Sequence, residues 1–409
     1  QYKDIIEAVA SGDLSEEYVN TSVKRILRLI LNSRKMEQYP FSGNPDLEAH
    51  ARITRQSAAE GIVLLRNEDA LPLRENLNVA LFGVSSFRLI VGGAGSGDVV
   101  EPYSVSLNEG LENVGFENST GYKINQVTVE DFEAHVAANP KAFEKKEALQ
   151  AMMDPSTPPE LLPSDAVVSE AARGADLAII TIGRNSGEGS DRVEADDFLL
   201  SDKEQNMITK VCDAFHAAGK KVIVVLNIGG VIETASWKEQ PDAILLAWQG
   251  GQEGGNSIAD VLTGKVNPSG KLPMTFPIAL ADHASTVNFP LDGEPFDFMA
   301  MMQQKDKPEK EQVKNKDYTR YEEGIYVGYR HFDKNEVEVS YPFGYGLSYT
   351  TFEYSELNVN IGNDTVQVMI SVTNTGEVAG KEVLEIYTSK PDTQIDRPNY
   401  ELKTFAKTP

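Results

Sequence analysis

Four short apolar runs, each followed by a loop rich in glycine or amide residues, constrain the fold of this chain most strongly. They occupy residues 78–82, 177–182, 221–226 and 243–248. Continuous apolar character is typical of strands that are buried on both faces, and the segments between these runs are long enough for crossover helices. The pattern predicts an α/β domain with a mostly parallel sheet and helices on both of its faces.

The loops after these strands predict where a ligand would bind. They occupy residues 92–98, 183–192, 227–230 and 249–255. In open α/β sheets, ligands bind outside the carboxyl ends of the strands, and parallel strands bring these ends to one edge. We therefore expect the four loops to form the rim of a single site.

The loop at residues 183–192 is the strongest candidate for chemistry, because it holds two acids and two arginines but few apolar groups. Glu188 stands between two glycines, which allow the backbone to approach a ligand closely while the carboxylate projects toward it. The residues of this loop alone fit a second interpretation equally well. It could be a solvated surface loop whose acids and arginines pair with each other.

The glycine-rich sequence GGAGSGD at residues 92–98 raises the question of a nucleotide cofactor. Phosphate-binding loops need the spacing G-x-G-x-x-G or G-x-x-x-x-G-K-[ST], and neither spacing occurs here. Asp98 would also repel a phosphate. The loop therefore favours a polar, uncharged ligand, and we expect no cofactor.

Composition excludes several classes of function. The 409 residues carry a formal net charge of −24, which disfavours a nucleic-acid partner because such binding depends on Lys and Arg. Cys212 is the single cysteine, so an intrachain disulfide and a redox pair are both excluded. The five histidines are scattered without ligand spacing, and we expect no metal.

No apolar run approaches the roughly 18 residues of a membrane span, so no membrane association is expected. The cysteine content leaves the compartment undetermined, with the cytoplasm favoured over secretion. The chain does not begin like a natural start, so a targeting segment could precede it. A homo-oligomer is left open.

The sequence predicts four consecutive parts. Residues 1–52 should hold the last helix of a preceding domain, at residues 16–31 with Ser15 as N-cap, and a linker. Residues 53–290 should form the α/β domain, with a helix at residues 51–65 across its start and a helical excursion between the first two strands. Residues 291–335 read as a linker with a charged insertion.

Residues 336–409 should form an all-β domain, because Val366, Val368, Ile370 and Val372 alternate with Gln367, Met369, Ser371 and Thr373. Such alternation is typical of a half-buried antiparallel strand in a β-sandwich. A seven-strand sandwich needs roughly 100 residues, more than remain here. The domain is therefore expected to be cut short.

Seven stretches together resemble the C-terminal half of glycoside hydrolase family 3, the β-glucosidase family. They are SVKRILRLIL, QSAAEGIVLLRNEDALPL, GGAGSGDV, SGEGSDR, GGQEGGNSIADVLTGKVNPSGKLPMTFP, EEGIYVGYRHF and YPFGYGLSYTTFEY, in the order of the family. The resemblance implies a TIM-like barrel, an α/β sandwich domain and a fibronectin type III-like domain, of which this chain would lack the barrel.

The resemblance also implies roles for individual residues. Glu188, in SGEGSDR, would be the general acid/base, and Gly95 and Ser96, in GGAGSG, would border the sugar. Asp191 and Arg192 belong to the same motif as Glu188 and are interpreted as residues that order the loop beside the substrate. The implied substrate is a β-glucoside or an oligosaccharide.

The nucleophile of the family is an Asp near the end of the barrel, and it has no counterpart here. Ser201 and Asp202 fit a helix N-cap instead. We therefore expect a retaining β-glycosidase that is complete only with its barrel, and a chain that is inactive alone. The alternatives are a non-catalytic carbohydrate-binding or interaction module, and a cofactor-binding α/β enzyme, which the broken phosphate fingerprint disfavours.

Overall fold

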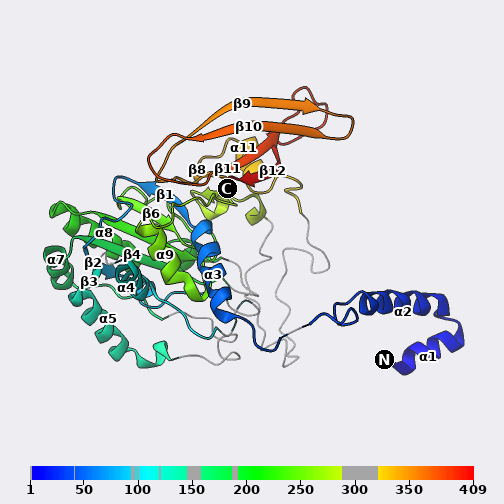
Figure 1. The fold of residues 1–409 in the computed structure, drawn as a ribbon, viewed down its shortest axis with the longest axis horizontal. Helices are drawn as coiled ribbons and strands as arrows, with labels where there is room; N and C mark the ends of the chain where they lie inside the picture. Colours follow the sequence, from blue (N-terminus) through cyan, green and yellow to red (C-terminus); the bar gives the residue numbers. More distant parts are fainter. Residues whose placement is uncertain are drawn as a thin grey trace. The chain divides into compact units, whose positions relative to one another are not determined.

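A computed structural model of the chain gives two compact units, residues 1–50 and residues 51–409, which are described separately (Figure 1). The structure describes residues 2–40, 42–93, 97, 99, 101–118, 121–144, 158–186, 192–287 and 321–409.

The first unit contains two amphipathic helices, α1 (Tyr2–Ser11) and α2 (Glu16–Leu31). The predicted N-cap of α2 is confirmed, because the side chain of Ser15 accepts a hydrogen bond from the backbone N–H of Glu17. No residue of either helix is buried, and Ile26 on the apolar face of α2 is 58% exposed. The apolar face of α2 is therefore not covered by the other described residues of this unit.

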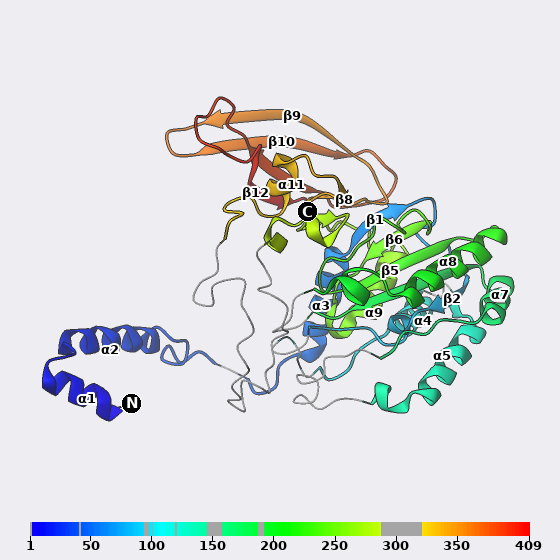
Figure 2. The same ribbon diagram turned by 180° about the vertical axis from the view of Figure 1, so that it is seen from behind.

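The second unit is organised around a six-stranded sheet with the order β1-β6-β5-β4-β2-β3 (Figures 1 and 2). Its strands are β1 (Val63–Asn67), β2 (Asn78–Phe82), β3 (Lys123–Ile124), β4 (Leu177–Arg184), β5 (Val222–Ile228) and β6 (Ala243–Leu246). All neighbouring pairs are parallel except β1 with β6. The predicted mostly parallel sheet is confirmed.

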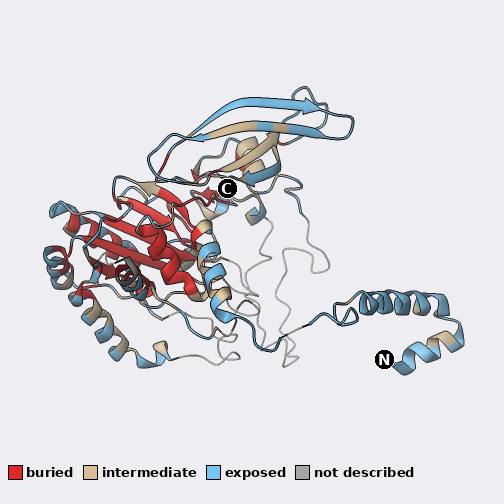
Figure 3. Ribbon diagram, viewed as in Figure 1, coloured by how far each residue is buried: buried red, intermediate tan, exposed pale blue. Residues whose placement is uncertain are grey.

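Helices cover both faces of this sheet. They are α3 (Leu47–Gly61), α4 (Leu107–Asn118), α5 (Gln126–Ala138), α7 (Asp165–Gly174), α8 (Asp202–Ala217) and α9 (Gly254–Leu262). Side chains of α7 and α8 pack on one face, and those of α3, α4 and α9 pack on the other. Successive residues of one strand divide between the two layers: Ile180 points to the first and Ile179 to the second. Figure 3 shows that burial is concentrated in these layers.

One sequence prediction was wrong at the start of this unit. The helix expected at residues 51–65 ends at Gly61 as α3, and Val63 opens strand β1. The apolar run from Val63 to Leu65 fits either a helix or a strand by pattern alone. Antiparallel pairing with β6 selects the strand.

The C-terminal part of the second unit contains two-stranded antiparallel sheets. Its elements are β7 (Phe276–Pro277), α11 (Tyr329–Lys334), β8 (Val339–Tyr341), β9 (Phe352–Ile361), β10 (Val366–Asn374), β11 (Val383–Thr388) and β12 (Glu401–Lys407). Strand β7 pairs with β8, β9 with β10, and β11 with β12. The strand predicted from the alternation at residues 366–373 is confirmed as β10, and these sheets fit the expected β-sandwich.

Ion pairs and strand-like contacts join this part to the α/β layers. Lys271 Nζ lies 3.0 Å from Glu382 Oε1, and Lys381 Nζ lies 2.9 Å from Glu60 Oε1 on α3. The backbone N–H of Leu347 donates to the carbonyl of Leu64, on strand β1. The C-terminal strands therefore lie against the edge of the main sheet that β1 forms.

Candidate functional site

The candidate site lies where the carboxyl ends of β2, β4, β5 and β6 meet. Asn227, near the end of β5, is 2% exposed and ties two neighbouring loops to its own strand. Its Nδ2 donates to the carbonyls of Ile90 (2.9 Å) and Trp248 (2.8 Å), and its Oδ1 accepts from the N–H of Ile90 (2.7 Å). The loops after β2 and β6 are thereby fixed to the end of β5.

Ser186 connects the loop after β4 to the same group. Its hydroxyl donates to Gln249 Oε1 at 3.2 Å. A Cβ on Gly93 would lie 2.8 Å from the carbonyl oxygen of Ser186, and a Cβ on Gly229 would overlap its hydroxyl. Glycine at these two positions therefore permits the close approach of the loops. As far as their described residues extend, the four predicted loops meet at one edge.

A buried ion pair supports the start of the loop after β4. Arg184, the last residue of β4, donates to both carboxylate oxygens of Glu204 on α8, at 2.5 and 2.6 Å. Both side chains are nearly buried, with exposed fractions of 10% and 4%. Burial disfavours the charged guanidinium, but the hydrogen bonds and the charge of Glu204 outweigh it and raise the pKa of Arg184. Arg184 therefore stays charged and its charge is neutralised locally.

The same carboxylate caps helix α8. Glu204 Oε2 accepts from the backbone N–H and the hydroxyl of Ser201, and the Ser201 side chain accepts from the N–H of Glu204. This capping box confirms that Ser201 and Asp202 begin a helix, as the sequence predicted. The capping box thus couples the first turn of α8 to the end of β4.

Arg192 stands at the far end of the loop and reaches back to its beginning. Its Nη1 donates to the carbonyl of Asn185 at 3.1 Å and also pairs with the carboxylate of Asp197. Asp197 in turn accepts from the backbone N–H of Val193 at 2.9 Å, and its own carbonyl accepts from Arg184 Nε. These contacts fit the predicted loop-ordering role of Arg192.

The second terminal nitrogen of Arg192, Nη2, is buried and has no hydrogen-bond partner among the described residues. The other predicted site residues, namely Gly95, Ser96, Glu188 and Asp191, lie outside the described residues. The structure describes the residues on either side of 187–191, which form a frame around this segment. Arg184 and Arg192 hold the two ends of residues 187–191 together.

Sequence reasoning missed one carboxyl group near this edge. Glu160 Oε1 accepts from the backbone N–H groups of Val84, just after β2, and of Leu161, each at 2.9 Å. Burial raises the pKa of Glu160 to about 7, against the lowering effect of these two donors. No sequence pattern marks this residue, because its environment is made by segments that are far apart in the chain. Its contacts indicate a structural role.

Within the described ranges there is no group of three or more His, Cys, Asp or Glu side chains that could hold a metal ion. Among the same residues, no helix is long and apolar enough to cross a membrane.

Comparison with known proteins assigns the chain to a family. The model of the glycosyl hydrolase family 3 C-terminal domain matches residues 62–349. This range contains all six strands of the central sheet and all four loops of the candidate site. The chain belongs to glycosyl hydrolase family 3. The resemblance inferred from the seven sequence stretches is therefore confirmed.

Members of family 3 with known names and structures are similar over nearly the whole chain. A structure of beta-glucosidase 3B from Thermotoga neapolitana in complex with glucose superposes with a TM-score of 0.86 at 41% identity, covering 100% of this chain and 53% of that one. Beta-glucosidase A of Butyrivibrio fibrisolvens is 35% identical over 405 residues, covering 88% of this chain and 44% of that protein.

Another family 3 relative carries a different name. An exo-alpha-(1->6)-L-arabinopyranosidase of Bifidobacterium breve is 29% identical over 98% of this chain and 47% of its own length. The chain thus spans about half the length of the curated relatives it matches.

Proposed function

We propose that this chain is the part of a retaining β-glycosidase that supplies the general acid/base, Glu188. The observation that carries the proposal is the frame around the motif SGEGSDR. The motif leaves the end of β4 at the carboxyl edge of the sheet, and its flanking residues are held by Arg184 and Arg192. Family membership supports the proposal, because named members of the family are glycosidases.

Retaining hydrolysis needs two carboxyl groups roughly 5 Å apart, one to attack the anomeric carbon and one to protonate the leaving oxygen. We propose that Glu188 is the second of these and that the nucleophile is an Asp in a barrel domain outside this chain. The uncovered apolar face of α2 supports such a neighbour. The proposed parts are residues 1–52, 53–290, 291–335 and 336–409.

The proposed acid has to remain protonated near neutral pH until it donates to the leaving group. Two arginines flank its loop, and an unpaired guanidinium would lower the pKa of a nearby carboxyl group. Here Glu204 neutralises Arg184 and Asp197 pairs with Arg192. The two arginines therefore order the loop while their charges are paired. They do not add two unpaired positive charges that would lower the pKa of Glu188 and oppose its role as an acid.

The proposed substrate is a terminal non-reducing β-D-glycosyl residue, with glucose as the first candidate because several relatives are named beta-glucosidases. The relative named as an arabinopyranosidase supports testing other pyranosides beside it. The paired arginines and the acidic composition disfavour a phosphorylated sugar.

The test is Glu188→Ala in a form of the protein that includes the barrel. Aryl glycosides with good leaving groups should still form the glycosyl-enzyme, because they need little protonation, and the intermediate should then accumulate. Azide needs no general base, so it should restore turnover and give a β-glycosyl azide. Substrates with poor leaving groups should lose far more activity.

Glu194→Ala is the matched control, because Glu194 is a nearby exposed acid just beyond the motif. This variant should keep the parent activity and show no dependence on azide. Equal slowing of all substrates by Glu188→Ala, with no azide effect, would reject the assignment. Turnover by the 409-residue chain alone would show that a second carboxylate lies within it. A barrel-containing protein that binds sugars without turnover would instead favour a non-catalytic module.

A further inference from the structure

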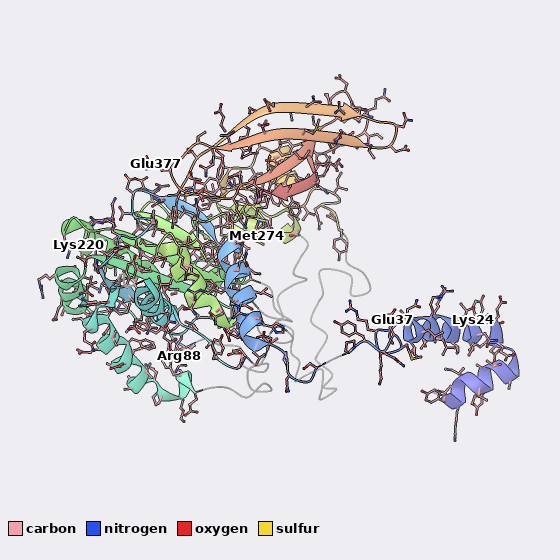
Figure 4. The ribbon with its side chains drawn as sticks, in the orientation of Figure 1. Lys24, Glu37, Arg88, Lys220, Met274 and Glu377 are labelled. Carbon is pink, nitrogen blue, oxygen red and sulfur yellow. The ribbon has the colours of Figure 1, made fainter. Side chains whose placement is uncertain are left out.

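A cavity lies in the C-terminal part of the second unit, and none of its lining residues belongs to the loops of the candidate site. Its volume is about 670 Å³, within the range of roughly 300–1,000 Å³ that is typical of small-molecule sites. Residues of α11, β8, β11 and the segment before β12 line it, together with Thr275 beside β7. Figure 4 labels Met274, the neighbour of Thr275, which packs against the core of the main sheet.

Aromatic side chains form one wall of this cavity. The ring of Tyr329 is stacked with Tyr400 (6.2 Å between centroids, 14° between planes) and tilted against Phe343 (5.0 Å). Tyr387 meets Tyr329 and Tyr400 edge-on, at 5.9 and 5.3 Å. The mutual packing of these rings fixes their orientation, while Tyr400 remains 39% exposed. The wall therefore offers a preorganised aromatic surface to a ligand.

Polar groups are held in place between these rings. Tyr387 donates its hydroxyl to Glu385 Oε2 at 2.6 Å, which leaves Oε1 as an acceptor. Burial and a hydrogen bond to Asp333 raise the pKa of Tyr400 to about 12, so its hydroxyl stays protonated at neutral pH. Asn399 donates its side-chain amide to the carbonyl of Asp333 at 2.9 Å, which orients the Asn399 carbonyl oxygen.

Two further observations indicate a built site. Gly344 has φ +79°, and a Cβ there would overlap the carboxylate of Glu385, so glycine is needed for the carboxylate to sit against this backbone. Thr275 is 3% exposed, and its hydroxyl has no hydrogen-bond partner among the described residues.

The chemistry of the lining selects the ligand class. Neither Lys nor Arg lines the cavity, whereas Glu385 and Asp333 do, so an anionic ligand is disfavoured. Both carboxylates already accept hydrogen bonds from tyrosine hydroxyls, so they do not require a cationic ligand as a partner. The remaining polar lining groups are neutral hydroxyls and an amide, and Phe332, Val337, Val339 and Pro342 add apolar surface.

A molecule with many hydroxyls and a flat C–H surface matches this set, because C–H groups pack on the negative face of an aromatic ring while hydroxyls bond to carboxylate and amide groups. We propose that this cavity is a saccharide-binding site, separate from the catalytic loop, that holds the end of an oligosaccharide. The proposal does not depend on Glu188 being the acid/base.

The test is calorimetric titration of the 409-residue chain with cellotetraose. We expect one binding event at the cavity, with at least a tenfold loss of affinity in Tyr400→Ala and in Glu385→Gln. The second variant has the same shape as the parent side chain, so it keeps the test valid if Tyr400→Ala folds poorly. Tyr354→Ala, on strand β9 and 49% exposed, is the control and should bind like the parent.

Other titrations separate the alternatives. Tetramethylammonium and inorganic phosphate should bind at least tenfold more weakly than cellotetraose, and tighter binding of either ion would overturn the assignment to a saccharide. Loss of binding in Glu188→Ala, with full binding in both cavity variants, would place the saccharide at the catalytic loop and reject the proposal. Absence of cellotetraose binding at millimolar concentration would also reject it.

Discussion

Replacing Glu204 with Gln should strongly destabilise the second unit. The variant removes the negative charge from a pair in which Arg184 and Glu204 are only 10% and 4% exposed. Removing one partner of such a buried pair typically costs about 3–5 kcal/mol, because the other charge is left uncompensated. Arg184 keeps two carbonyl acceptors, those of Asp197 and Gly183. We therefore expect the lower end of this range, about 3 kcal/mol.

The free energy of unfolding can be measured in urea through tryptophan fluorescence. Trp237 is 3% exposed in the core of this unit, and its indole N–H donates to the carbonyl of Glu233, so its emission should report the loss of the native core. The midpoint concentration of urea should fall markedly in Glu204→Gln. The slope of the transition should not change if the variant affects only the folded state.

Two controls isolate the buried pair. Asp165→Asn breaks an ion pair with Lys210 in which Asp165 is 86% exposed, and it should leave the midpoint almost unchanged. Arg184→Met combined with Glu204→Leu removes both charges and should be more stable than Glu204→Gln alone. A loss below about 1 kcal/mol in Glu204→Gln would refute the reasoning, since water would then be compensating Arg184.

Three further predictions concern other parts of the second unit. Burial raises the pKa of Glu160 from 4.5 to about 7, so in this range the folded state binds more protons than the unfolded state. The free energy of unfolding should therefore fall as the pH rises from 4.5 to 7. Glu160→Gln should flatten this dependence in urea titrations at several pH values. Cys212 is buried and its pKa is raised to about 12, so a thiol reagent should modify it only in denaturant. Gly83 has φ +83°, and a Cβ there would overlap the carbonyl oxygen of Thr181, so Gly83→Ala should lower the thermal midpoint by several degrees. Gly219 also has positive φ, but a Cβ there would meet open space. Gly219→Ala should therefore lower the midpoint less.

Local sequence patterns predicted the main elements because their signals lie within short segments. The apolar run at residues 177–182 became the core of β4, and the same reasoning located β2, β5 and β6. Ser201 was predicted as an N-cap from its position before a helix, and the capping box with Glu204 confirms it. Parallel strands bring their carboxyl ends to one edge, so the meeting of the four loops also followed from the sequence.

The sequence alone could not decide the features that depend on partners distant in the chain. Val63–Asn67 is a strand because it pairs with β6, and its short apolar run carries no signal that separates strand from helix. The loop at residues 183–192 left two interpretations open. The structure shows that its arginines pair with Glu204 and Asp197, outside the motif itself.

The sequence by itself determined the fold class and the sheet edge where the candidate loops meet. It also supplied the motif with Glu188, whose role remains a prediction. Tertiary structure decided how the candidate site is supported: Asn227 ties the loops after β2 and β6 to β5, Glu204 of α8 neutralises Arg184, and burial raises the pKa of Glu160. The reason is physical. Periodicity and capping are properties of neighbouring residues, whereas burial and charge compensation exist only when separate segments pack together.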